Sequence, residues 1–307
     1  MNKDNSQIIV QVSWLGIIDK GGANVHKCIR PACLITRLNI YDNIKQEMIN
    51  KELELIQNEL FKGFTDPLPN NAIVNFISSG SKFIRSVLPI YYLKSQNCEI
   101  TQEISKILAA GEIIHNASLL HDDVIDKADI RREKATLAKI FTPEISILSG
   151  DYLLAEATKK ILETNQAEIL YLFLDCTKKM TEAELKQHFL KGKIPTQEEY
   201  LSICKGKTAS LFATILESCA LISGLDKIVA HNFAESFGIC FQIKNDLELK
   251  SSLEDKNNQI HTAKDVLGIE KTNLLLDNYK KEMKSFIKDF PENNYKKELE
   301  DLINSLW

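Results

Sequence analysis

Residues 101–132 read TQEISKILAAGEIIHNASLLHDDVIDKADIRR, and this stretch decides the fold. Thr101 is a typical N-cap residue and Glu103 falls in the first turn, so a helix is expected to begin here. Between Glu112 and Asp122 the segment carries almost no charge. We therefore expect one long helix that is buried on all sides and ends in a cluster of carboxylates.

The rest of the chain indicates an all-α fold as well. Glycine and proline are scarce, at 12 and 7 of 307 residues, which leaves too few turns for an all-β protein. Helical spacing of apolar residues begins near Asn39, and no strand is expected. DPLPNN (66–71) is interpreted as a loop. Further helices are predicted at 71–95 (one or two short ones), 143–163, 166–190, 197–223, 227–252, 264–288 and 294–306.

Residues 1–37 differ from the rest of the chain and are interpreted as an N-terminal extension of unknown structure, ahead of one domain at 38–307. The start of the chain lacks the layout of a secretory signal, and no apolar run reaches the ~18–20 residues that span a bilayer. A net charge of −4 argues against a general nucleic-acid-binding surface.

The cysteines are typical of a reducing compartment. There are seven, an odd and scattered set in a long chain, which favours reduced core residues in a cytoplasmic protein over a disulfide framework. His26, Cys28 and Cys33 would suit a metal, but no second ligand cluster accompanies them.

The carboxylate cluster in HDDVID has the spacing of a metal site. Asp122 and Asp126 lie one helical turn apart on the same face, and Asp123, although rotated by ~100°, is grouped with them as a candidate metal ligand. Paired carboxylates repel each other unless a cation lies between them, and hard oxygen ligands suit Mg²⁺. The alternative is a helix that simply ends at solvent, but acids are unfavourable at a helix C-terminus. Arg131 and Arg132 come shortly afterwards, and paired guanidinium donors suit diphosphate.

Two further positions could bind a second anion. In SSGSKFIRSVLP (78–89), Lys82 and Arg85 would share a helix face beside a glycine and serines, although a solvated charge pair is the alternative. His115 lies two turns before Asp122 on nearly the same face. A lone histidine in an apolar helix is more often a core residue, so its binding role depends on those neighbours.

Two motifs in the second half of the chain also adjoin apolar runs. KGKT (205–208) places Lys207 and Thr208 at the start of a core helix. FQIKNDLELK (241–250) places Asn245 and Asp246 after another apolar run. The second motif is interpreted as a possible metal face opposite the first.

At this point the order of motifs resembles the trans-isoprenyl diphosphate synthases, also called polyprenyl synthetases. The motifs that carry the resemblance are SGSKFIRSVLP, LLHDDVIDKADIRR, SGDYLLAEA, GKTASLF and FQIKNDLEL, between about residues 40 and 290. The resemblance implies long helices around a central cavity, the isoprenoid synthase type of fold, usually in a homodimer. It also implies Mg²⁺-dependent head-to-tail condensation of isopentenyl diphosphate with an allylic diphosphate.

Roles carry over onto the matching positions as implications of the resemblance. Asp122 and Asp126 would bind the Mg²⁺ that holds the allylic diphosphate, which Arg131 would also hold. Isopentenyl diphosphate would be held by Lys82, Arg85, His115 and Arg132. The allylic site would be lined by Lys207, Thr208 and Gln242. Ala117 and Ser118, just before the first Asp motif, are small and imply a product longer than farnesyl.

The second Asp motif departs from the family pattern. Asn245 and Leu249 stand where the family has aspartates, and Asp246 alone remains. A terpene cyclase would need a hydroxyl at 249 and an acid at 253, where this chain has leucines. The lysine that the family places after this motif would have to be replaced by Lys256 or Lys264.

Three interpretations therefore stay open. The first is an active synthase with a weakened metal site on the second motif. The second is a non-catalytic or regulatory synthase subunit that binds diphosphates or pairs with an active partner. The third is a related class I terpenoid cyclase.

Overall fold

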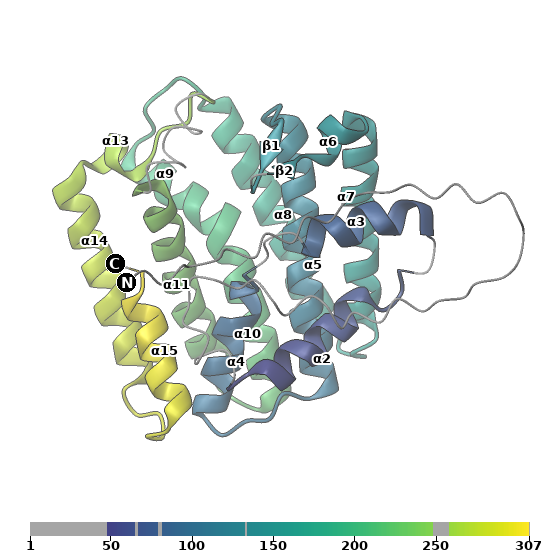
Figure 1. Ribbon diagram of the computed structural model, residues 1–307. Coiled ribbons are helices and arrows are strands. Elements are labelled where there is room, and N and C mark those ends of the chain that lie inside the picture. The colour runs from purple at the N-terminus through teal and green to yellow at the C-terminus, as the bar shows by residue number, and fades with distance from the viewer. Residues whose placement is uncertain (1–47, 65–66, 79–81, 133, 248–257, 307) are drawn as a thin grey trace, which may run out of the picture. The chain divides into compact units, whose positions relative to one another are not determined.

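The described part of the chain is almost entirely helical, as predicted (Figure 1). The computed structural model describes residues 48–64, 67–78, 82–132, 134–247 and 258–306, all within the unit that spans Arg37–Trp307. The predictions for residues 1–37, including His26, Cys28 and Cys33, lie outside the described residues, as do Leu249 and Lys256.

The first helices are α2 (Asn50–Phe61), α3 (Pro67–Ser78), α4 (Ile84–Ser95), α5 (Gln102–Ile125), α6 (Leu137–Ile140) and α7 (Pro143–Leu162). They are followed by α8 (Ala167–Phe189), α9 (Gln197–Cys204), the π-helical turn η1 (Lys205–Ala209), α10 (Ser210–Ser223), α11 (Lys227–Leu247), α13 (Ala263–Leu267), α14 (Ile269–Ile287) and α15 (Asn294–Asn304).

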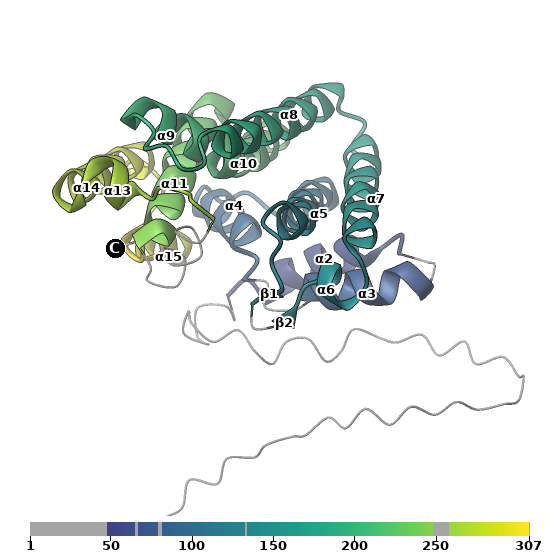
Figure 2. The same ribbon diagram turned by 90° about the horizontal axis from the view of Figure 1, so that it is seen from above.

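Helix α5 is the central element. It begins as predicted, because the Thr101 hydroxyl accepts a hydrogen bond from the Ile104 N–H at 3.3 Å. It packs against α2, α7 and α10, and in the view from above it lies with α4 between α2 and α10 (Figure 2). A Cβ at Gly111 would come within 2.3 Å of the Ile215 side chain, so glycine permits the close approach of α5 to α10. The apolar run of α5 is thus enclosed by helices rather than exposed on one face.

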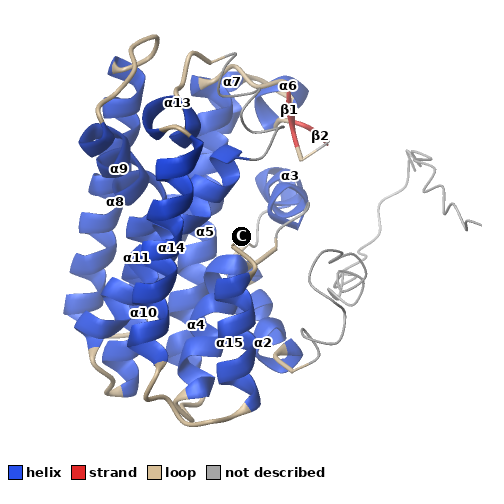
Figure 3. Cartoon of the chain, turned by 90° about the vertical axis from the view of Figure 1, so that its left-hand side faces the viewer, coloured by secondary structure: helices blue, strands red, loops and turns tan. Residues whose placement is uncertain are grey.

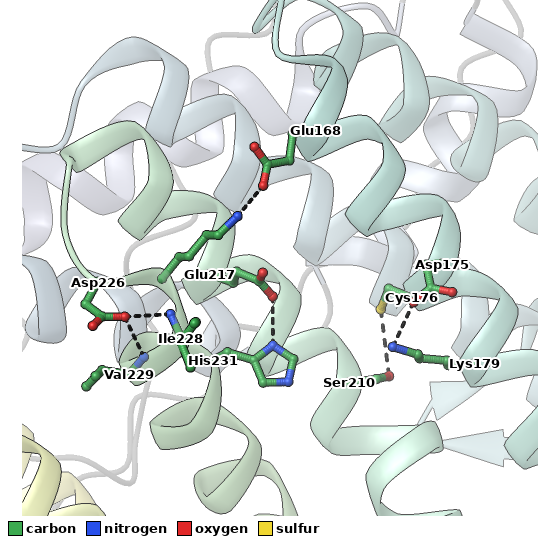
Figure 4. Close-up of polar contacts among 11 residues, drawn as sticks. Glu168, Asp175, Cys176, Lys179, Ser210, Glu217, Asp226, Ile228, Val229 and His231 are labelled. Atoms are coloured by element: carbon green, nitrogen blue, oxygen red, sulfur yellow. Dashed lines mark hydrogen bonds and ion pairs between the residues drawn. The ribbon is translucent and has the colours of Figure 1, made fainter.

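Salt bridges and caps brace the helices that lie beside this core (Figure 4). Lys227 at the start of α11 pairs with Glu168 at the start of α8, and His231 lies 2.7 Å from Glu217 of α10. The Asp226 carboxylate accepts hydrogen bonds from the first N–H groups of α11. These contacts fix where α11 starts and therefore where its far end, with Asn245 and Asp246, arrives.

The elements near the end of α5 gather at one end of the helices. Strands β1 (Ile130–Arg131) and β2 (Lys134–Ala135) form a short antiparallel hairpin directly after α5. Figure 3 shows this hairpin and α13 at the same end of the long helices. The chain therefore brings together the ends of segments that are more than 100 residues apart.

Several local predictions were wrong. DPLPNN is not a loop, because α3 begins at Pro67; proline is tolerated in the first turn of a helix, where its missing N–H has no intrahelical partner. The β1–β2 hairpin and α6 were not expected. The predicted helix 264–288 is divided at Gly268, whose positive φ of 76° favours glycine.

The described cysteines agree with the expectation of reduced core residues. Cys176, Cys204, Cys219 and Cys240 are buried and free, and Cys98 is half-buried and free. Among the described residues, no helix combines the length and the apolar character needed to cross a bilayer.

Candidate functional site

A cavity of about 580 Å³ opens among α4, α5, α8, η1 and α11. It collects most of the residues singled out from the sequence, namely Lys82, Arg85, His115, Asp122, Arg131, Arg132, Lys207, Thr208, Gln242, Asn245 and Asp246. A smaller cavity of about 230 Å³ shares part of this wall and is also lined by Asp126. Asp123 lines neither cavity. The motifs of the sequence are therefore neighbours in space, although up to 164 residues separate them.

The last turn of α5 presents Asp122 and Asp126 together. The Asp126 N–H donates to the Asp122 carbonyl at 2.8 Å, which confirms the one-turn separation. Burial raises the pKa of Asp122 to about 6, and the negative charges of Glu184 and Asp126 act in the same direction against the Lys207 ammonium. The surroundings of Asp122 therefore disfavour its charged form, which a bound cation would stabilise.

Asp123 points elsewhere. Its side chain is fully buried and forms an ion pair with Arg131, while burial raises the pKa of the carboxyl against that pairing. The sequence prediction grouped Asp123 with the metal ligands. In the structure this carboxylate orients Arg131, a residue of the cavity wall.

The larger cavity is also lined by cations. Arg85 is buried, its guanidinium lies 4.9 Å from the centre of the Phe212 ring, and burial lowers its pKa to about 10. The Arg85 Nε is a buried donor for which the described residues provide no acceptor. Lys82 lines the same cavity but lies before α4, so the prediction that the two share a helix face was wrong. A buried donor without an acceptor beside a cavity is suited to an anionic ligand.

His115 faces these cations from α5. Burial lowers the pKa of His115 well below its ordinary value, and the charges of Arg85, Arg132 and Arg131 lower it further. The imidazole is therefore neutral at pH 7 and can donate or accept a hydrogen bond without adding charge.

Lys207 and Thr208 lie in the π-helical turn η1, inside a continuous helical segment rather than at its start. Single π-helical turns often occur at functional sites. Lys207 pairs with Glu184; its burial disfavours the charged form, but Asp122 and Glu184 outweigh this and raise the pKa of the ammonium. Lys207 therefore stands as a fixed cation opposite Asp122.

The second Asp motif is organised differently from the first. Asp246 accepts hydrogen bonds from the Tyr200 hydroxyl at 2.6 Å, the Gln242 amide at 2.8 Å and the Ala263 N–H at 3.1 Å. The Thr208 hydroxyl in turn donates to Gln242 at 2.6 Å. Burial raises the pKa of Asp246 against these hydrogen bonds. Asp246 is thus the acceptor of a buried network, and Asn245 lines the cavity without a charge.

The donor set fits a divalent cation on one side only. Asp122 and Asp126 supply hard oxygen atoms on one face, which suits Mg²⁺ completed by water and phosphate oxygens. Among the described residues no group of three or more histidine, cysteine or acidic side chains is arranged to hold a metal by itself. The second motif adds no free carboxylate, because three donors occupy Asp246.

The remaining wall of the larger cavity is largely apolar. It includes Ile114, Ser118, Leu119, Leu154, Met180 and Phe241. Ser118 lines the cavity, whereas Ala117 is fully buried and lines neither cavity. One cavity therefore joins a charged end to an apolar surface.

Sequence reasoning missed several residues of the site. Lys191 pairs with Asp126, Glu184 pairs with Lys207, Tyr200 binds Asp246, and Glu112 lies in the cavity wall beside Arg85. No local pattern marks these two residues. Lys191 reaches the site from the connection after α8, and Tyr200 reaches it from α9. Lys264, considered from the sequence, lines neither cavity.

An all-helical fold around a cavity lined by carboxylates, cations and apolar side chains is the arrangement expected of an isoprenoid synthase. The sequence model of the family described as polyprenyl synthetase matches residues 66–304. A protein described as prenyl transferase from Cyanophora paradoxa is 32% identical over 216 residues, which is 67% of each chain. The chloroplastic solanesyl diphosphate synthase 1 of Arabidopsis thaliana is 28% identical over 213 residues, 66% of this chain and 52% of that protein.

The fold agrees with these sequence matches. A decaprenyl diphosphate synthase from Rhodobacter capsulatus superposes with a TM-score of 0.77 at 19% identity, covering 85% of this chain and 97% of that one. The chain belongs to the polyprenyl synthetase family of prenyltransferases.

Proposed function

We propose that this chain is an active trans-polyprenyl diphosphate synthase, which joins isopentenyl diphosphate to an allylic diphosphate and releases a product longer than farnesyl diphosphate. One observation carries the proposal. The larger cavity is lined by Asp122, by lysine and arginine side chains and by apolar side chains, and the adjoining smaller cavity shares Asp122 and adds Asp126. That arrangement suits a substrate with a diphosphate head and a hydrocarbon tail.

The side chains have distinct tasks in this proposal. Lys207 and Arg131 stabilise the negative charge that develops on the leaving diphosphate of the allylic substrate. Arg85, with its buried unpaired Nε, binds isopentenyl diphosphate together with Lys82, Arg132 and neutral His115. The apolar wall excludes water, which would otherwise capture the allylic cation. Thr208 and Gln242 orient their dipoles beside that cation, and the released diphosphate takes the proton.

Mg²⁺ is the cation that this donor set suits best. Asp122 and Asp126 would hold it, and it would neutralise the charge of the allylic diphosphate. Asn245 could add one amide oxygen from the facing wall. Asp246 contributes indirectly, because it holds Gln242 in place.

Product length is inferred from the wall below the carboxylates. Ser118 is small and lines the cavity, so no bulky side chain stands at this position of the wall, whereas Ala117 does not line it. The names of the plant and bacterial relatives above, solanesyl and decaprenyl diphosphate synthase, support the same direction.

A non-catalytic subunit is the second candidate. The observation that favours it is the second motif, where Asn245 has no charge and Asp246 is occupied by three hydrogen-bond donors. Such a subunit would bind diphosphates through the first motif without ionising them.

An elongation assay distinguishes the candidates. Purified protein is incubated with Mg²⁺, radiolabelled isopentenyl diphosphate and dimethylallyl, geranyl or farnesyl diphosphate, and the products are sized. The active-synthase proposal expects labelled chains longer than farnesyl diphosphate. Binding of the diphosphates without elongation from any primer would support the non-catalytic subunit. A cyclised hydrocarbon formed without isopentenyl diphosphate would instead indicate a cyclase.

We also infer that the chain forms a homodimer through the outer face of α8. Tyr171, Leu174, Leu185 and Phe189 recur on that helix and are more than half exposed, with Phe189 at 75%. A stripe of this kind is suited to burial against a second copy. Light scattering on the wild type and Phe189→Asp tests this, since the substitution should shift the protein from dimer to monomer.

The buried free thiols support a reducing compartment, and we infer a cytoplasmic location from them. Cell fractionation with an antibody against the chain would test this location.

A further inference from the structure

The connection between α8 and α9 brings a lysine to the first carboxylate motif. Lys191 comes just after the end of α8, and its Nζ lies 3.3 Å from Oδ1 of Asp126. Both side chains are largely covered, with relative exposures of 21% and 18%. Asp126 therefore has a cation of the protein itself as its partner.

The backbone around Lys191 is held in place. The Gly192 N–H donates to the Gln259 carbonyl at 2.9 Å, and the Lys193 N–H donates to the Leu190 carbonyl at 2.9 Å. Gly192 has a φ of 77°, in the left-handed region that glycine tolerates best. The turn therefore has a defined position that sets the Lys191 ammonium beside Asp126, a residue of the smaller cavity, although Lys191 itself lines neither cavity.

The wall of the smaller cavity carries charges of both signs. It includes Lys193, Lys207 and Arg131, and its acids are Asp122, Asp126 and Asp246. Asp246 is occupied by hydrogen bonds, and Asn245 on the second motif has no charge. A diphosphate bound here would find little metal-binding capacity on the second motif, so protein cations must supply more of the neutralising charge.

We propose that Lys191 is a diphosphate ligand that changes partners: it neutralises Asp126 in the metal-free protein and binds a diphosphate oxygen once a divalent cation occupies the carboxylates. Lys193, on the same turn and in the wall of the smaller cavity, adds a second ammonium group. The inference rests on the proposed function, because it takes a diphosphate as the substrate group.

A purely structural ion pair predicts something different. Removal of a lysine that only stabilises the turn would leave diphosphate affinity unchanged or would weaken the folded state as a whole. A lysine that competes with a metal and then binds diphosphate gives effects of opposite sign, since its loss frees Asp126 for the metal but removes a donor to the phosphate oxygens.

Two binding titrations on the full-length chain measure these effects. Electron paramagnetic resonance monitors Mn²⁺ binding without diphosphate, and calorimetry monitors inorganic diphosphate at saturating Mg²⁺. Lys191→Ala should bind Mn²⁺ several-fold more tightly and diphosphate about tenfold more weakly. Lys191→Arg should keep the wild-type diphosphate affinity within about threefold. Lys186→Ala on α8 removes the same charge away from both of these cavities and should change neither titration.

The outcomes separate this inference from the proposed function. If wild-type protein binds no diphosphate, the proposed function itself is contradicted. If the wild type binds it and Lys191→Ala binds it equally well, only the role of Lys191 is overturned. Thermal unfolding measured by circular dichroism identifies loss of structure, and Lys191→Gln, which keeps the side-chain stem, replaces the alanine variant if that variant does not fold.

Discussion

The two aspartate motifs occupy similar places and are built in opposite ways. Each comes after a long apolar helical run and each lines the same cavity. On α5, Asp122 faces the cavity in surroundings that raise its pKa to about 6. On α11, Asp246 is buried and accepts three hydrogen bonds. The first carboxylate keeps a charge available for a ligand, whereas the second is committed to the protein.

The difference between the two motifs predicts that substitutions in the first mainly affect activity and substitutions in the second mainly affect stability. A carboxylate in surroundings that disfavour its charge costs folding free energy at neutral pH, and that cost is relieved when a cation binds. Burial also raises the pKa of Asp246, but three hydrogen-bond donors depend on this carboxylate, so its removal would leave them unpaired and it has little capacity left for a metal. Substitutions on the two walls should therefore have different consequences.

The largest expected effect is the loss of activity in Asp122→Asn. The amide cannot supply the charge that a metal requires, and metal stabilisation of a leaving diphosphate contributes several kcal/mol, so elongation should fall about 1,000-fold or more. The free energy of unfolding should not fall, because the variant removes an unfavourable charge. Elongation is measured with radiolabelled isopentenyl diphosphate, and stability by urea denaturation.

Asp129→Asn is the matched control for that experiment. Asp129 is an exposed aspartate just beyond the motif and pairs with Lys139. Its substitution should leave elongation within about twofold of the wild type, as expected for a surface ion pair. Equal losses in both variants would show that the assay reports general charge rather than the metal-binding wall.

The second-largest effect is expected for Asp246→Ala, which should lower the stability of the fold. It leaves the donors of Tyr200, Gln242 and Ala263 without their acceptor, which should lower the free energy of unfolding by about 3 kcal/mol. Tyr200→Phe removes one donor only and should cost about 1 kcal/mol. Urea denaturation measures both. If Asp246→Ala unfolds at the wild-type midpoint, the comparison between the two walls is wrong.

Much of the fold was predictable because its signals are local. The apolar run of α5, its Thr101 cap and the spacing of apolar residues along the chain predict long helices, and these are present. The errors arose where local rules compete. Pro67 was interpreted as a loop residue, although proline is also favoured in a first turn. The division at Gly268 left no signal except the glycine itself.

The site was predictable only where a motif carried it. Most motif residues line one of the two cavities, with Asp123 as the exception, but their partners could not be found in the same way. Lys191 and Tyr200 reach Asp126 and Asp246 across 65 and 46 residues. The exclusion of Asp123 from the cavity depends on Arg131, whose position is set by the hairpin after α5. Contacts of this kind depend on tertiary packing and leave no period or spacing in the sequence.

Asn245→Asp should give a smaller effect, a gain in elongation, because it makes the second aspartate motif more like the first. The new carboxylate would face the cavity beside Asp246 and give the second motif one acid that can bind a metal. Elongation at low Mg²⁺ should rise several-fold, and half-maximal activity should need less Mg²⁺. Asn245→Ala provides the comparison in the opposite direction. An unchanged rate and Mg²⁺ dependence in Asn245→Asp would mean that this wall is not impaired.

The smallest effect concerns pH and the histidine on the α5 wall. Burial and three arginines lower the pKa of His115, so the folded protein leaves the imidazole neutral while the unfolded chain takes up a proton below about pH 6.5. The unfolded state then binds more protons, and the free energy of unfolding falls as pH falls, by up to about 1.4 kcal/mol per pH unit. Asp122, with its raised pKa, has the opposite sign between about pH 4 and 6, so the wild-type curve alone cannot isolate His115.

The difference between wild type and His115→Gln does isolate it. This difference in the free energy of unfolding should change between pH 7 and 5, because only the wild type loses the contribution of the neutral imidazole. His188→Gln, which changes an exposed histidine on α8 that lines neither cavity, is the control and should not reproduce the change seen with His115→Gln. If the His115→Gln and wild-type curves stay parallel, the imidazole is equally able to take up a proton in both states. Arg85, Arg131 and Arg132 would then not lie close enough to His115 to form, beside the Asp122 motif, the anion-binding group of cations that we infer.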